Sequence, residues 1–194
     1  MKYQEWRTAA CDPAARRSME RAGVPPLAAL TLCARGLDTV EKARSFLDAG
    51  RGQLLEPRLM KDMDTAAARV RRALERGEQI AVYGDYDVDG ITSTCLLTDC
   101  LTRLGGRVRS YIPDRLEEGY GLNEEAVLHL AQQGVTLIIT VDCGITAVEE
   151  AACAASLGVA LVITDHHECK EALPAALAVV DPRRPDCPSP FKCL

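Results

Sequence analysis

The chain has 194 residues, of which 47% are hydrophobic and only 4% aromatic, and its formal net charge is −5. The hydrophobic share is ample for a buried core and excludes a disordered chain. The scarcity of aromatic residues favours aliphatic strands covered by helices over a β-sandwich. Nucleic-acid-binding domains are often basic throughout, so the acidic balance argues against such a surface but leaves room for a local basic lining.

The cysteines and the hydropathy pattern indicate where the protein works. Nine cysteines occur without a Cys-x-x-Cys pair, so no spacing typical of a zinc ribbon is present. No apolar run reaches the roughly 18 residues that a membrane span needs, and the N-terminal residues lack the apolar centre of a signal peptide. We therefore expect a reduced, cytoplasmic protein with no membrane segment.

Residues 1–78 are expected to form a helical N-terminal lead-in. Within it, Asp38 and Glu41 have the spacing of a helix N-cap and its capping-box partner. Asp62 or Asp64 is expected to open the next helix, in which the spacing of Ala, Val and Leu is helical and the arginines spread over the polar side.

From residue 79 onward, short apolar strands alternate with amphipathic helices. We expect strands over 79–84, 107–113, 135–142, 159–165 and 176–182, and helices over 91–106, 123–134 and 146–158. This alternation predicts an α/β fold with a doubly wound, parallel sheet covered on both faces. The predicted domains are thus the lead-in (1–78) and an α/β domain (79–194).

Acidic residues and histidines follow three of the expected strands. They are Asp85, Asp87 and Asp89 after the first strand, Asp142 at the end of the third, and Asp165, His166 and His167 at the end of the fourth. Open α/β sheets bind ligands at the edge where these strands end. Clustered carboxylates repel one another unless cations neutralise them, and carboxylates with imidazoles suit Mn²⁺, or Mg²⁺ with more water. One Asp shared by two ions is the arrangement used on phosphate esters.

Three other interpretations of the segment GDYDVDGITS (84–93) are weaker. A dinucleotide fingerprint needs glycines where this segment has acids. An EF-hand needs a bidentate Glu where Leu96 stands, and a helix where a strand precedes the loop. A haloacid-dehalogenase-like phosphatase carries DxDGT, but Ile91 replaces the Thr, and this interpretation leaves the Asp-His-His sequence at 165–167 unexplained.

Five blocks in this order point to one family. They are VYGDYDVDGITST (82–94), YIPDRLEEGYGLN (111–123), IITVDCGITA (138–147), ITDHHE (163–168) and VVDPRRPDCPSPFK (179–192). Together they closely resemble the bacterial RecJ single-strand-specific exonucleases of the DHH phosphoesterase superfamily. The resemblance implies 5′-to-3′ hydrolysis of single-stranded DNA at a dinuclear Mn²⁺ site, in DNA repair and recombination.

The resemblance also implies roles for individual residues. Asp85 resembles a ligand of one metal and Asp87 a ligand of the other, while Asp142 resembles the carboxylate that bridges them. His166 resembles a further ligand of the second metal, and His167 is expected to face the scissile phosphate and to stabilise its developing charge.

Further residues are expected to support this centre. Asp89 and Asp165 are expected to orient the metal ligands, and Gly90 to let the chain turn tightly into the next helix. Arg115 and Asn123 are candidates for contacts with the substrate phosphate or with the loops of the metal site.

The chain departs from the family pattern at two places. Many superfamily members carry a metal-binding His just upstream of the first aspartates, where residues 81–83 here are Ala, Val and Tyr. The family also supplies a later aspartate, a second core domain and a DNA-binding domain, which we expect beyond residue 194. Asp181 matches the strand-end block rather than that later aspartate. The single-stranded DNA is expected to bind mainly through those further domains, and no protein partner can be named.

Two other functions remain open at this point. One is a DHH phosphoesterase that acts on short oligonucleotides, cyclic dinucleotides or pyrophosphate. The other is a non-catalytic DHH scaffold, against which the joint presence of Asp85, Asp87, Asp142 and His166 argues.

Overall fold

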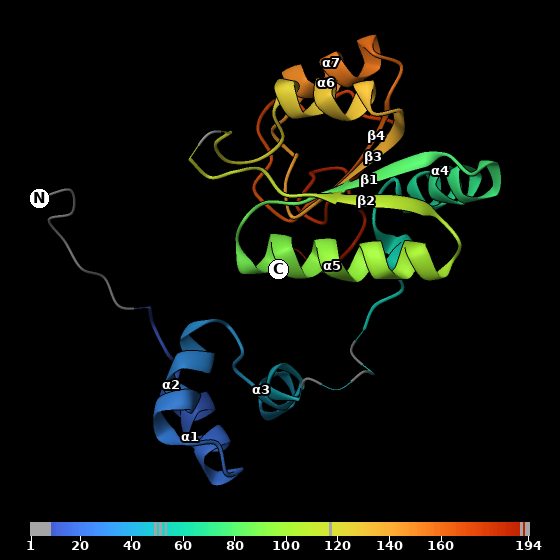
Figure 1. Ribbon diagram of the computed structural model, residues 1–194. Coiled ribbons are helices and arrows are strands. Elements are labelled where there is room, and N and C mark those ends of the chain that lie inside the picture. The colour runs from blue at the N-terminus through green and yellow to red at the C-terminus, as the bar shows by residue number, and fades with distance from the viewer. Residues whose placement is uncertain are drawn as a thin grey trace, which may run out of the picture. The chain divides into compact units, whose positions relative to one another are not determined.

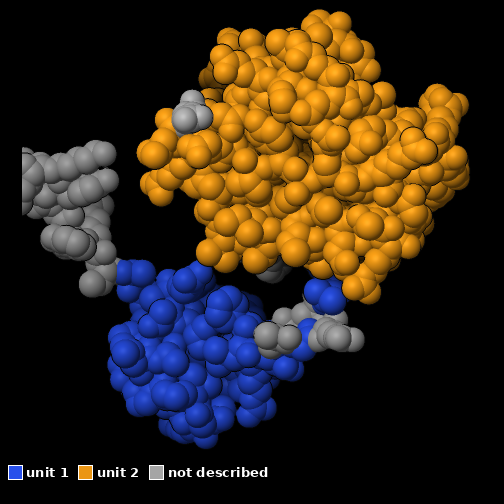
Figure 2. Space-filling model, in the orientation of Figure 1, with its two compact units in different colours: residues 1–55 blue, residues 56–194 orange. Residues whose placement is uncertain are grey.

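The computed structural model describes residues 9–48, 50, 52, 54–116, 118–190 and 192. The chain divides into two compact units, residues 1–55 and residues 56–194, which Figure 2 distinguishes by colour. This boundary precedes the predicted division at 78/79, because the helix over 63–76 belongs to the larger unit. Its buried residues Ala66 and Ala73 share a hydrophobic core with the strands of that unit.

The smaller unit is helical, as predicted. Its helices are α1 (Pro13–Arg21), α2 (Pro26–Ala34) and α3 (Val40–Leu47). They bury a small core that includes Met19, Leu32 and Ala43. The N-cap of α3 is Thr39, which accepts a hydrogen bond from the backbone N–H of Lys42, whereas the predicted cap, Asp38, pairs with the Lys42 ammonium group.

The larger unit alternates strands and helices, which confirms the predicted α/β class. Its elements are η2 (Pro57–Leu59), α4 (Met63–Arg76), β1 (Gln79–Tyr83), α5 (Val88–Arg103), β2 (Arg107–Tyr111), α6 (Glu124–Gln132), β3 (Val135–Val141), α7 (Val148–Ser156), β4 (Ala160–Thr164) and β5 (Ala178–Val180). The five strands form one sheet in the order β2-β1-β3-β4-β5, and all neighbours are parallel. No helix in the described part of the chain is long and apolar enough to cross a membrane.

Helices cover both faces of the sheet. Figure 1 shows α6 and α7 over one face and α4 and α5 over the other. Successive strand residues point to opposite faces, so Ala81 and Tyr83 of β1 enter the core under α6 and α7. Their neighbours Ile80 and Val82 enter the core under α4 and α5. Burial on both faces explains why β3, β4 and β5 are largely apolar, whereas β2, at one side of the sheet, is partly exposed and carries two arginines.

The strand order creates a crevice at one edge of the sheet. β1 pairs with β2 on one side and with β3 on the other, so the chain leaves β1 and β3 toward opposite faces. In open α/β sheets this switch point is where ligands bind. Tyr83, Thr140 and Ile163 are neighbours across β1, β3 and β4, so the segments that follow these strands start at similar heights.

A buried arginine ties the start of α4 to the strand β5 and the segment after it. The Nη1 of Arg184 donates to Oδ2 of Asp62 and to the carbonyl oxygen of Val179, both at 2.6 Å. Its other nitrogens donate to both carboxylate oxygens of Asp186, each at 2.9 Å. Only 8% of the Arg184 side chain is exposed, so these bonds replace the water that the guanidinium group loses.

We expect Arg184→Ala to lower the free energy of unfolding by about 2–4 kcal/mol, because Asp62 loses its buried cationic partner and the carbonyl of Val179 loses a donor. Urea denaturation of both proteins measures the difference. Arg71→Ala is the control, since Arg71 is exposed on α4 and its loss should change the free energy by less than about 0.5 kcal/mol. Equal effects of the two substitutions would contradict this role of Arg184.

Candidate metal centre

Asp85 is the second residue after β1 and is fully buried. Its Oδ1 accepts the backbone N–H of Asp87 at 3.2 Å, while its Oδ2 is buried without a hydrogen-bond partner among the described residues. A buried carboxylate oxygen without a donor is costly unless a cation occupies its lone pair. Asp85 therefore has the character of a metal ligand.

Gly90 makes room for this carboxylate. A Cβ atom at Gly90 would lie 2.0 Å from Oδ1 of Asp85 and 2.7 Å from its backbone nitrogen. Gly90 is inside α5, and its φ is not among the positive values. The glycine is thus required for close packing against Asp85, and not for the tight turn that the sequence suggested.

Asp87 is the N-cap of α5. Its Oδ1 accepts the backbone N–H groups of Asp89 at 2.8 Å and Gly90 at 3.0 Å. The hydrogen bond from Gly90 is the largest of the effects that hold the pKa of Asp87 below its usual value. Asp87 is therefore ionised at neutral pH, held in place by the helix terminus, and able to offer its other oxygen to a cation.

Asp142 directly follows β3 and lies between the other acidic groups and the histidines. Its backbone has φ 60°, a left-handed conformation that is uncommon outside glycine. Its Oδ1 lies 2.8 Å from Nε2 of His166. Burial raises the pKa of Asp142, and the charges of Asp85 and Asp87 raise it further, against the opposing effect of His166. A bound cation would reverse this unfavourable charge balance.

Asp165 holds both histidines in place. Its Oδ1 accepts the backbone N–H groups of His166 and His167 at 2.7 and 3.1 Å, and also contacts Nδ1 of His167 at 2.7 Å. Its Oδ2 accepts the backbone N–H of Ile145 at 2.9 Å. With 1% of the side chain exposed and both oxygens occupied, Asp165 has the geometry of a residue that orients its neighbours.

The contact with Asp165 determines which nitrogen His167 can offer. Because Nδ1 faces a carboxylate, Nε2 is the ring nitrogen of His167 that can contact a bound group. Burial lowers the pKa of His167, but the hydrogen bond and charge of Asp165, with the charges of Asp142 and Asp85, outweigh burial and raise it above the usual value. The raised pKa favours the imidazolium form, which can stabilise an anionic group.

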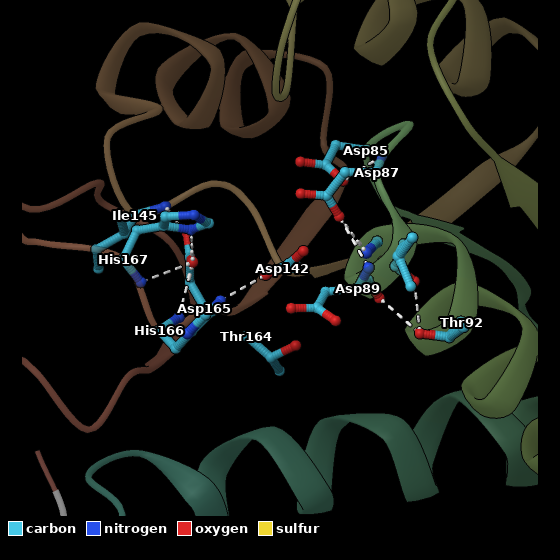
Figure 3. Close-up of polar contacts among 12 residues, drawn as sticks. Asp85, Asp87, Asp89, Thr92, Asp142, Ile145, Thr164, Asp165, His166 and His167 are labelled. Carbon is cyan, nitrogen blue, oxygen red and sulfur yellow. Dashed lines mark hydrogen bonds and ion pairs between the residues drawn. The ribbon is translucent and has the colours of Figure 1, made fainter. Parts of the chain in front are cut away.

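The candidate ligands form two overlapping groups. In each group the ligand atoms lie within 4.8 Å of one another, and the groups are Asp85, Asp87 and Asp142, and Asp142, His166 and His167. Figure 3 shows Asp142 between the aspartates that follow β1 and the histidines that follow β4. Asp142 belongs to both groups, as a carboxylate shared by two cations must. Oxygen donors with imidazole nitrogens suit Mn²⁺, so the residues fit the expected metal.

Three other predicted site residues lie outside these groups. Asp89 is exposed and lines a cleft together with Asp142 and His166. Arg115 lies over the ring of Tyr86, with its guanidinium carbon 5.2 Å from the ring centre. Asn123 caps α6 by accepting the backbone N–H of Ala126 at 2.7 Å, so its position supports a structural role more directly than a substrate contact.

Tyr120 is a neighbour of the site that the sequence did not reveal. Burial and the nearby Asp85 carboxylate raise its pKa, with smaller contributions from Asp142 and Asp87. Its ring meets that of Tyr86 edge to face at 5.8 Å. The only signal in the sequence is an aromatic residue between Gly119 and Gly121, which does not indicate proximity to the segment that follows β1.

We expect Asp165→Asn to weaken Mn²⁺ binding by about 10–100-fold. An amide cannot accept at both of its ends, so either Ile145 or the histidine pair loses its acceptor. Isothermal titration of the full-length protein with Mn²⁺ measures the change. Asp99→Asn removes the same charge from an exposed pair with Arg103 and should leave the affinity unchanged. Equal affinities of Asp165→Asn and the unmodified protein would refute the orienting role.

Comparisons with known proteins agree with this geometry. A family model described as "DHH family, N-terminal domain" matches residues 79–193. The single-stranded-DNA-specific exonuclease RecJ of Bacillus subtilis is 47% identical over 175 residues, which cover 90% of this chain and 22% of that protein. The chain thus spans less than a quarter of the length of this relative.

Two solved structures are also similar. The crystal structure of RecJ in complex with Mn²⁺ from Thermus thermophilus matches with a TM-score of 0.68 and 34% identity, over 94% of this chain and 26% of that one. A crystal structure of exonuclease RecJ bound to manganese matches with a TM-score of 0.63 and 41% identity, over 69% of this chain and 34% of that one.

Proposed function

The chain belongs to the DHH family, and from this premise we propose that the whole protein is a metal-dependent exonuclease that degrades single-stranded DNA from the 5′ end. Its relatives in Bacillus subtilis and Thermus thermophilus carry the name single-stranded-DNA-specific exonuclease RecJ. We further propose that it acts in DNA repair and recombination in the cytoplasm.

The observation that carries the proposal is the position of Asp142. This one carboxylate belongs to two groups whose ligand atoms lie within 4.8 Å of one another, one acidic and one containing both histidines. We propose that Asp142 would bridge two Mn²⁺ ions. By the resemblance to the family, Asp85 would hold one ion, and Asp87 and His166, which lie on either side of Asp142, would hold the other. Two such ions clamp the attacking and leaving oxygens of a phosphodiester and lower the pKa of a bound water. Mg²⁺ can take the same ligands with more water in its coordination shell.

The protein's own side chains would prepare the substrate. Nε2 of His167 is turned away from Asp165 and can donate a hydrogen bond to a phosphate oxygen on which charge develops. The guanidinium group of Arg115 lies over the ring of Tyr86, which stands between the candidate ligands Asp85 and Asp87 in the sequence. An arginine at this place can bind phosphate with two parallel hydrogen bonds. Asn123 supports the same segment from its position at the start of α6.

Asp87→Asn in the full-length protein should reduce Mn²⁺-dependent degradation of single-stranded DNA at least about 100-fold. Asparagine caps a helix as well as aspartate does, so α5 should stay intact while the charge that binds the cation is lost. The rate is measured with a 5′-labelled strand under excess Mn²⁺. Asp12→Asn is the matched control, because Asp12 is also an N-cap and lies in the other compact unit. Similar activity of Asp87→Asn and the control would contradict the assignment.

The 194-residue chain by itself should bind Mn²⁺ weakly and degrade single-stranded DNA slowly. It spans 22% of the length of the Bacillus subtilis relative, and its net charge of −5 offers little attraction for a polyanion. Titration with Mn²⁺ and a nuclease assay beside the full-length protein measure both properties. Processive digestion by the short chain would overturn this expectation.

A substrate panel tests the proposed substrate class. The full-length protein should degrade long single strands faster than dinucleotides, cyclic dinucleotides or pyrophosphate. Preference for any of the small substrates would instead identify a small-substrate phosphoesterase, and the absence of all hydrolysis would leave a scaffold.

A further inference from the structure

The segment between β2 and α6 is anchored by a glutamate that no part of the proposed chemistry uses. Oε1 of Glu118 accepts the hydroxyl of Tyr111 at 2.5 Å, and Oε2 accepts the backbone N–H of Asp114 at 2.7 Å. The backbone N–H of Glu118 in turn donates to the carbonyl of Asp114 at 2.9 Å. One side chain therefore closes the segment on itself and fastens it to the last residue of β2.

The anchor reaches the buried end of the sheet. The ring of Tyr111 stacks on that of Tyr83 at 5.2 Å, and Tyr83 is fully buried at the end of β1. The hydroxyl of Tyr83 donates to the carbonyl of Gly121 at 2.8 Å and accepts from Nδ2 of Asn123 at 3.3 Å. Burial and the contact with Glu118 raise the pKa of Tyr111 to about 12, so its hydroxyl remains a donor throughout the neutral range.

The anchored segment carries two side chains, Arg115 and Tyr120, that contact the ring of Tyr86, the residue between Asp85 and Asp87 in the sequence. Arg115 lies between Asp114 and Leu116, whose backbone N–H donates to Oδ1 of Asp114 at 2.8 Å. Arg115 covers one part of the Tyr86 ring and Tyr120 meets the same ring edge to face. Arg115 and Tyr120 are exposed and each makes a single weak contact with this ring, so these contacts cannot hold an arginine in one position without the anchor.

We propose that Glu118 and Tyr111 are positioning residues that hold Arg115 and Tyr120 beside the metal centre and thereby determine how tightly the substrate strand is bound. This proposal rests on the proposed function for its substrate, but the anchoring itself does not. Glu118 touches neither the candidate metal ligands nor the space between them, so its loss should affect capture of the strand and leave the chemical step intact.

Limited trypsin digestion of the full-length protein tests the anchoring without reference to activity. In Glu118→Gln the amide can accept only one of the two hydrogen bonds, and in Tyr111→Phe the hydroxyl is absent. Cleavage after Arg115 should become about tenfold faster in each variant, because the segment opens locally more often. Cleavage after Arg76, at the end of α4, should keep its rate and reports on the rest of the unit.

Steady-state kinetics with single-stranded DNA tests the consequence. Each variant should raise KM about tenfold at saturating Mn²⁺, with kcat and Mn²⁺ affinity unchanged, as expected when binding is lost equally from ground and transition states. The double variant should raise KM by much less than the product of the single effects, because the two side chains form one anchor. Glu75→Gln, which removes the same charge from an exposed site on α4, should change nothing.

The outcomes separate the two proposals. If the unmodified protein does not degrade single-stranded DNA, the proposed function fails, and faster cleavage after Arg115 still supports the anchoring. Unchanged cleavage after Arg115 in both variants overturns the anchoring. Faster cleavage with unchanged KM, or a fall in kcat alone, overturns the role of the anchor in substrate binding.

Discussion

The larger unit depends on how its fold tolerates the mutual repulsion of three carboxylates. Asp85, Asp87 and Asp142 bring oxygen atoms within 4.8 Å of one another, and two of these residues are buried. Such a group is unfavourable without a cation: burial raises the pKa of Asp142, and the charges of Asp85 and Asp87 raise it further. The fold tolerates it because the start of α5 supplies donors to Asp87 and because a divalent ion would convert the repulsion into ligation.

The surrounding structure makes this arrangement rigid. The parallel sheet places the ends of β1, β3 and β4 side by side, and Asp165 directs both histidines toward Asp142. Gly90 allows the first turn of α5 to approach Asp85 more closely than any side chain would permit. Each of these features helps to hold the carboxylate oxygens close together. Without them, water would separate the charged groups.

Much of the site was predictable because strand ends in a parallel sheet meet at one edge. Apolar runs located β1, β3 and β4, and the aspartates after them therefore had to lie close together. An orienting position for Asp165 was also expected. Its pairing with Ile145 was not, since that contact joins segments 20 residues apart. The position of Asn123 as a helix cap likewise depends on which backbone donors the folded chain brings near it.

The sequence by itself determined the α/β class, the order of the strands and helices along the chain, and the residue types available to bind a metal. These features could be predicted because the spacing of hydrophobic residues, and the residues that follow each strand, are visible in short stretches of sequence. The tertiary structure was needed to show that α4 packs against the sheet, that Gly90 is required for close packing, and that Glu118 fastens the segment that carries Arg115. These features depend on distances between side chains from separate elements, which no local sequence pattern encodes.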